Sequence, residues 1–246
     1  MRSRAIALLL FLASPSLVSA DALADLRAKL KSLTPQGEIR ARIDVQSRSE
    51  SSENDNVDTS TESVLGELGP QGLRIGWMVD QLAAARAAEM QSHRNPDAPQ
   101  TGVVLGEIPA STLANLLDHA WGLLLTLEGG TLVDQKPDNS KGVCGLLLVV
   151  RPLNRMSAAD AKIIKSYEDV LKIWLDAEGW PVGSDRQIKY RGSKFFVSFS
   201  GEQRQQREYA RANGHLIIAH ETRQGSGSGL GTESHGTTTT TVTLMP

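Results

Sequence analysis

The stretch Tyr167–Ser200, YEDVLKIWLDAEGWPVGSDRQIKYRGSKFFVSFS, decides the fold class of this chain. Its first part carries apolar residues at every second position, which is typical of a β-strand. These residues are Leu171, Ile173 and Leu175. The segment Asp176–Gly179 then predicts a tight turn, with glycine at the position where a positive φ is needed.

The rest of this stretch predicts two more strands. Pro181 precedes the second strand, because proline cannot donate a hydrogen bond to a sheet, and Arg191–Lys194 predicts the next turn. The third strand places three apolar residues on one face, namely Phe195, Val197 and Phe199. Such short connections force neighbouring strands to be antiparallel, so the stretch predicts a three-stranded meander.

The N-terminus has the pattern of a secretory signal peptide. Arg2 and Arg4 precede the apolar run Ala5–Val18, and small residues follow up to Ala20. The run is short for a membrane span, although an uncleaved anchor is the alternative interpretation. We therefore predict a signal peptide over residues 1–20, a single domain over 21–246, no integral membrane span after cleavage, and a periplasmic or secreted protein.

Composition restricts the remaining possibilities. The chain has 26 basic and 28 acidic residues, a net charge of −2, and becomes more acidic once the two arginines of the leader are removed. This balance argues against nucleic acid as a partner. Cys144 is the only cysteine, so an intrachain disulfide is excluded and the core alone must stabilise the fold. An inert buried thiol is the expected state of Cys144.

The segments around the meander predict an α+β fold that is mainly antiparallel β. Asp21–Leu33 predicts an amphipathic helix, and Glu38–Ser47 predicts a strand with one apolar and one polar face. A helical insert is expected over about 79–127, with one long helix from Pro109 to Leu127. Further strands are predicted over 59–68, 73–77, 131–136, 143–150, 203–211, 215–222 and 237–244.

No stretch carries a recognisable catalytic, metal or cofactor motif. The five histidines lack the spacing of a zinc site. The glycine-serine segment Gln224–Gly236 matches no phosphate-binding or nucleophile motif, and we interpret it as a flexible hairpin loop or as a lid over a nearby cavity. We therefore expect a protein that is not an enzyme, with a hydrolase built from dispersed residues as an alternative.

Two segments resemble the periplasmic lipoprotein-carrier (LolA-like) half-barrel superfamily. One is the helix that begins at Leu23 and leads into the strand Ile39–Val45; the other is Ile173–Pro181, IWLDAEGWP. The resemblance follows the order of elements along most of the chain after residue 20. It implies a curved incomplete β-barrel that wraps around helices and leaves an apolar hollow. The pattern is also similar to exported bacterial proteins from which no activity would follow.

The resemblance implies binding of a hydrophobic ligand, such as an acyl chain or a lipoprotein, and a packed core without a cavity is the open alternative. In this view the Leu113–Leu124 helix faces the strand of Phe195 and Val197 across the hollow. An envelope scaffold or sensor that binds another protein is the second functional hypothesis. The candidate ligand-binding residues are Ile43, Val45, Ile75, Trp77, Leu113, Leu117, Trp121, Leu171, Ile173, Phe195, Val197 and Phe199.

The leader gives the first testable prediction. Cleavage after Ala20 should give an envelope-fraction protein whose N-terminal residue is Asp21, because a small residue precedes the expected cut. Intact mass and N-terminal sequencing measure this directly. A protein that keeps Met1 and sediments with membranes would contradict the signal peptide and favour the anchor.

Overall fold

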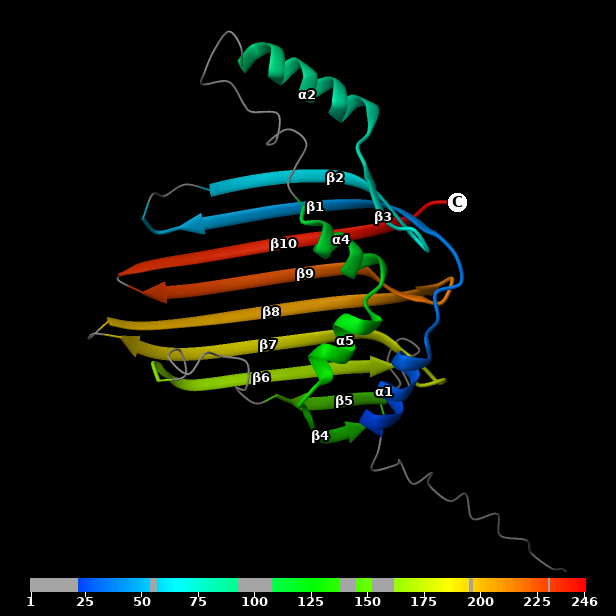
Figure 1. Ribbon diagram of the computed structural model, residues 1–246. Helices are drawn as coiled ribbons and strands as arrows, with labels where there is room; N and C mark the ends of the chain where they lie inside the picture. The colour runs from blue at the N-terminus through cyan, green and yellow to red at the C-terminus, as the bar shows by residue number, and fades with distance from the viewer. Residues whose placement is uncertain are drawn as a thin grey trace, which may run out of the picture.

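Figure 1 shows the computed structural model, which describes residues 22–53, 57–92, 108–137, 145–151, 162–194, 197–229 and 231–246. Four helices lie within these residues: α1 (Ala22–Ser32), α2 (Val79–Ser92), α4 (Ala110–Leu117) and α5 (Ala120–Leu127). The strands are β1 (Ile39–Ser51), β2 (Val57–Gly69), β3 (Gly72–Gly76), β4 (Thr131–Lys136), β5 (Gly145–Val150), β6 (Ile164–Leu175), β7 (Pro181–Lys194), β8 (Val197–Ala212), β9 (His215–Gly229) and β10 (Thr232–Leu244).

All ten strands form one open antiparallel sheet. Their order is β3-β2-β1-β10-β9-β8-β7-β6-β5-β4, so β3 and β4 are the two edges. The N-terminal and C-terminal meanders are joined where β1 pairs with β10, from the pair Ala41 and Leu244 to the pair Ser51 and Ser234. The predicted α+β class and the antiparallel arrangement are therefore confirmed.

The helices α1, α4 and α5 lie on one face of the sheet, which we call the helix face (Figure 1). They and the sheet share one apolar core, which includes Leu26, Leu30, Ile43, Leu113, Leu117, Leu123, Leu147, Leu171, Ile173 and Leu216. The helix α2 extends beyond the β2 side of the sheet (Figure 1). None of the helices in the described residues is long and apolar enough to cross a membrane.

The predicted turn at Arg191–Lys194 is wrong. These residues continue β7, which pairs with β8 up to Lys194 and Val197. The aromatic ring of Phe199 lies where a Cβ on Gly192 would stand, so the ring covers the glycine and fills the position that lacks a side chain. The turn at Asp176–Gly179 is confirmed, with Gly179 at a φ of 78°.

The predicted loop at Gln224–Gly236 is also wrong. Instead, β9 continues to Gly229 and β10 begins at Thr232, and the two strands stay in register through this segment. Glycine and serine alternate here with a period of two, so each residue type occupies one face of the strand. The strand pattern was present in the sequence but was hidden by the low β-propensity of glycine.

The single helix predicted from Pro109 to Leu127 is divided into α4 and α5. Asp118 is extended, and the His119 backbone N–H donates to the Leu216 carbonyl oxygen of β9 at 2.6 Å. With this bond to the sheet, the helix ends at Leu117 instead of continuing. The next helix, α5, then starts with a different rotation about its axis. As a result Leu123 is buried, whereas Trp121 is 68% exposed rather than part of the core.

Some predictions lie outside the described residues. These concern the leader over 1–20, the thiol of Cys144 and the side chain of Phe195. The helical insert over 79–127 and the single domain over 21–246 stay predictions, since α2, α4 and α5 cover only part of the insert.

Three glycines give a graded stability prediction. Gly214→Ala should destabilise most, because φ is 76° there and a Cβ would collide with the Thr34 backbone carbonyl. Gly179→Ala should cost about 1 kcal/mol, since φ is positive but the nearest neighbour is the flexible Lys29 side chain. Gly236→Ala in β10 should be neutral or slightly stabilising. Chemical denaturation measures the series, and equal midpoints for the three variants would contradict the assigned backbone conformations.

Candidate functional site

The helices cover only part of the helix face. The helix α4 contacts β9, β2 and β3, and α5 contacts β9 and α1. In Figure 1 these helices lie over the centre and right of the sheet, and none of the described helices lies over the left-hand ends of β7 to β10. We call this uncovered part of the helix face the open half.

Strand alternation identifies the side chains that face the open half. Val242 of β10 belongs to the core, so Thr240, Thr238, Gly236 and Ser234 share its face. Residues that pair directly across neighbouring strands also point to the same side of a sheet. The face therefore changes from apolar to hydroxyl-bearing and then to glycine and serine along one strand.

Glycines form the floor of the open half. Gly225 pairs with Gly236, and Gly227 pairs with Ser234, so these glycines lie on the helix face. We call Gly225, Gly227 and Gly236 the glycine floor. A Cβ on Gly225 would meet no atom within 4 Å, and one on Gly236 would meet only a backbone oxygen at 3.8 Å. The backbone is therefore accessible from above.

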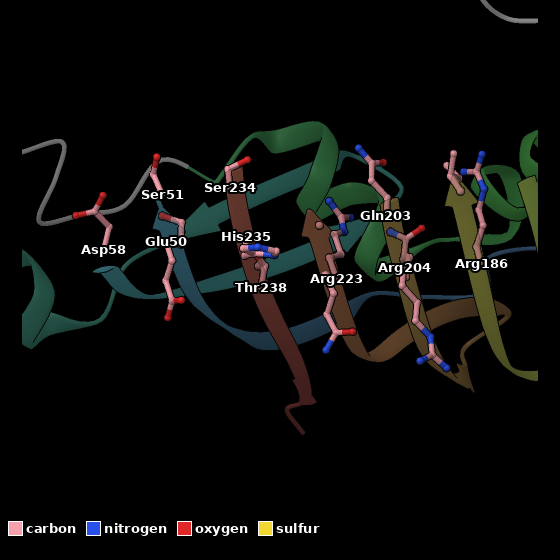
Figure 2. A pocket seen from close by; sticks show the side chains of 16 residues that line it. Glu50, Ser51, Asp58, Arg186, Gln203, Arg204, Arg223, Ser234, His235 and Thr238 are labelled. Carbon is pink, nitrogen blue, oxygen red and sulfur yellow. The ribbon is translucent and has the colours of Figure 1, made fainter. Parts of the chain in front are cut away.

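A hollow of about 670 Å³ lies over Gly225 and Gly236 of this floor (Figure 2). We call it the groove. Most of its lining residues share the helix face by register, whereas Glu50, Arg204, Gln224 and His235 alternate to the opposite face. The helix-face lining consists of Ser49, Ser51, Asp58, Arg186, Ile188, Gln203, Gln205, Arg223, Gly225, Ser234, Gly236 and Thr238.

A buried carboxylate marks the border between the core and the groove. Glu221 is only 2% exposed, and its Oε1 accepts hydrogen bonds from Arg207 Nε at 2.6 Å and Gln205 Nε2 at 2.9 Å. Its Oε2 lies 2.5 Å from Arg223 Nε. The ion pairs satisfy the buried charge of Glu221, which would otherwise be costly to desolvate.

His119 completes this cluster from the helix side. Arg207 Nη1 lies 3.1 Å from His119 Nε2, and His119 Nδ1 lies 3.0 Å from Asn115 Oδ1. Burial lowers the pKa of His119 to about 3, and the positive charges of Arg207 and Arg223 add to the effect. The imidazole is therefore neutral, with Nε2 accepting from Arg207 and Nδ1 donating to Asn115.

A second buried carboxylate lies on β6. Asp169 is 1% exposed and accepts two hydrogen bonds from Arg186, from Nε at 2.9 Å and from Nη2 at 2.7 Å. Arg151 Nη1 donates to the same carboxylate at 2.8 Å. Tyr167 donates to it at 3.2 Å, and burial together with the Asp169 charge raises the pKa of this phenol. The two-point contact fixes the Arg186 guanidinium at the edge of the groove.

The predicted ligand-binding residues fall into three groups. Most are packed in the core or against it: Ile43, Val45, Ile75, Leu113, Leu117, Leu171 and Ile173. Trp77 and Trp121 are exposed. Val197 and Phe199 are half-buried at the far end of β8.

The expectation that the Leu113–Leu124 helix faces Phe195 and Val197 is wrong for the described residues. Val197 begins β8, and the helices pack near its other end, where Tyr209 stacks on His119 with ring centroids 5.6 Å apart. An extended strand rises about 3.3 Å per residue, so roughly 40 Å of strand separates Val197 from Tyr209.

Two aromatic side chains lie on the helix face of β7 and β8, beyond the residues that line the groove. The ring of Tyr190 lies over Gly201, and the ring of Phe199 lies over Gly192. The two ring centroids are 6.5 Å apart. Ile188 lines the groove itself, and Tyr190 follows it on the same face of β7, so apolar surface continues beyond the groove in this direction.

The sequence patterns did not predict the arginine and carboxylate side chains at the border of the groove. The signal was the alternation of polar residues in strands that elsewhere face the core, such as Gln205 and Arg207 in β8 and Glu221 and Arg223 in β9. No group of three or more acidic, histidine or cysteine side chains within the described residues is arranged to hold a metal ion.

A comparison with models of known protein families finds no match, and no curated protein is significantly similar in sequence.

The neutral state of His119 gives a prediction on pH. An unfolded histidine binds a proton below pH 6.5, whereas the buried one does so only near pH 3. The free energy of unfolding should therefore fall as the pH drops through this interval, with up to about 1.4 kcal/mol per pH unit from this residue. His119→Gln removes the titration but keeps an acceptor for Arg207.

Urea denaturation between pH 6.5 and pH 4 tests this prediction. The carboxylates titrate in both proteins, so the difference between the two slopes isolates His119. The variant should be less stable at pH 7 but lose less stability on acidification. Parallel curves would contradict a neutral buried His119.

Proposed function

We propose that this protein is an exported carrier, not an enzyme, that binds a ligand with a hydrophobic chain. In this proposal the open sheet and its helices form an incomplete antiparallel barrel, as the resemblance to the LolA-like superfamily implies. The ligand is an acyl chain or the acylated part of a lipoprotein. One observation carries the proposal: the described helices leave part of the helix face uncovered, and a groove with a glycine floor lies there.

The shape of the groove supports a chain-like ligand. A sheet face normally presents side chains that fill the space above it, but the glycine floor leaves that space open. A methylene chain has about the width of the missing side chains. Its contact with Ile188, Tyr190 and Phe199 removes apolar surface from water, worth about 25 cal/mol per Å² before the cost of ordering the ligand.

The packed core does not line the groove. Leu113, Leu117 and Ile173 are fully buried and belong to one cluster. The proposed ligand therefore lies beside the core, and only a chain that extends past the groove would reach Val197 and Phe199 of the predicted set. Binding of this kind requires no rearrangement of α4.

The cellular location in the proposal rests on the leader. The charged start at Arg2 and Arg4, the apolar run Ala5–Val18 and the small residue Ala20 support export to the periplasm or the medium. A carrier in such a compartment would meet acyl chains and lipoproteins in transit between membranes.

Filling the groove tests the function. Gly225→Trp places an indole over the glycine floor, where an added Cβ would meet no atom within 4 Å. The variant should keep the unfolding midpoint of the wild type and bind dansyl-labelled undecanoic acid at least about tenfold more weakly, because the indole occupies the volume of the chain. Dansyl fluorescence and denaturation measure the two quantities.

Ser226→Trp is the matched control, since it adds the same ring one residue away on the opposite face of β9, and Ser226 does not line the groove. It should leave binding unchanged. If the wild type binds no probe, the carrier proposal is wrong, and protein binding through a sheet edge becomes the better hypothesis. If both variants bind like the wild type, the ligand lies outside the groove.

A further inference from the structure

We infer that the ligand of the groove is anionic and that Arg223 binds its head group, a carboxylate or a phosphate. This inference rests on the proposed function, which it deepens by assigning the charge and the orientation of the ligand. It is carried by the geometry of Arg223, by the charge of its cluster and by the position of the glycine floor.

The guanidinium of Arg223 is available for a second anion. Within the part of the chain that the structure describes, its ion pair is made by Nε to Glu221. The side chain is 48% exposed and lines the groove, where Figure 2 shows it on the helix face. The terminal amino groups Nη1 and Nη2 are therefore free to donate to oxygen atoms of a ligand, and their planar arrangement suits a carboxylate or a phosphate.

The cluster carries an excess of positive charge. Arg207 and Arg223 share the single carboxylate of Glu221, and His119 beside them is neutral. Arg207 is 10% exposed and its guanidinium is held between Glu221 and His119. The unbalanced charge is therefore presented to the groove at Arg223.

Arg186 is a weaker candidate for the same role. Its Nε and Nη2 both donate to Asp169, so the fork that would bind an anion is occupied. Its side chain is also only 24% exposed. Arg186 helps to fix the border of the groove, whereas Arg223 offers an open fork.

The surroundings of Arg223 orient the ligand. Gly225 follows on the same face, so no side chain separates the guanidinium from the glycine floor. The acidic Asp58 lines the groove from β2, which is three strands from β9, or roughly 14 Å away. An anionic head group is therefore attracted to the β9 side, and the chain extends over the floor toward Phe199.

A pair of probes that differ only in charge tests the inference. Dansyl-labelled undecanoic acid carries a carboxylate, and its methyl ester does not. The wild type should bind the acid more tightly, and Arg223→Gln should weaken acid binding by about tenfold while changing ester binding less than about twofold. Added salt should weaken binding of the acid but not of the ester.

Arg48→Gln is the control for charge alone. Arg48 is 63% exposed and lies on β1, where it alternates with the helix-face residues Ser47 and Ser49 and so points away from the groove. It should leave both affinities unchanged. Arg223→Lys, which keeps the charge but loses the fork, should retain part of the preference for the acid. Glu221 keeps Arg207 and Gln205 in each variant, and denaturation midpoints verify that the fold is intact.

The outcomes distinguish the anionic head group from the proposed carrier function. If the wild type binds acid and ester equally, or if Arg223→Gln weakens both alike, the anionic head group is wrong and the carrier stands. If neither probe binds the wild type, the carrier is wrong and the inference falls with it. If the inference holds, displacement of the acid by palmitate assigns a carboxylate, and displacement by lysophosphatidylglycerol alone assigns a phosphate.

Discussion

The connection between β3 and β4 has to cross the whole sheet. These strands are the two edges of a ten-stranded sheet, so about 43 Å separates them at 4.8 Å per strand. Every other described connection joins strands that are direct neighbours. The helices α4 and α5 belong to this one long crossing, and they pack where it passes over the sheet. The long connection from β3 to β4 thus accounts for both the core covered by α4 and α5 and the groove beside it.

Local sequence patterns predicted the local structure well. The alternation along Glu38–Ser47 and the turn at Asp176–Gly179 both correspond to observed elements, because each depends on residues close together in the chain. The pairing of β1 with β10 joins residues some 200 positions apart, and threonine-rich β10 carries no signal for a particular partner.

The wrong sequence predictions share one physical cause, which is contact between residues far apart in the chain. The break between α4 and α5 is stabilised by a bond from His119 to Leu216, which lies on a distant strand. The glycines at 192 and 201 stay in strands because rings of Phe199 and Tyr190 cover them. The candidate site was missed for a related reason, since Arg223 and Glu221 become neighbours of Arg207 only once β8 and β9 are paired.

The edge strands of the sheet also affect whether two molecules can pair their strands. The edge strand β3 is five residues long and pairs with β2 only from Leu65 to Gly69, so the remainder of β2 keeps an unpaired edge in the described residues. That part of β2 contains Asp58 and Glu62. A second molecule that added its own β2 antiparallel to this edge would bring acidic side chains of the two copies close together. The acidic edge thus opposes the pairing of strands between molecules, and the Ser63 carbonyl oxygen of this part of β2 already accepts a hydrogen bond from Gln81 Nε2 at 2.6 Å.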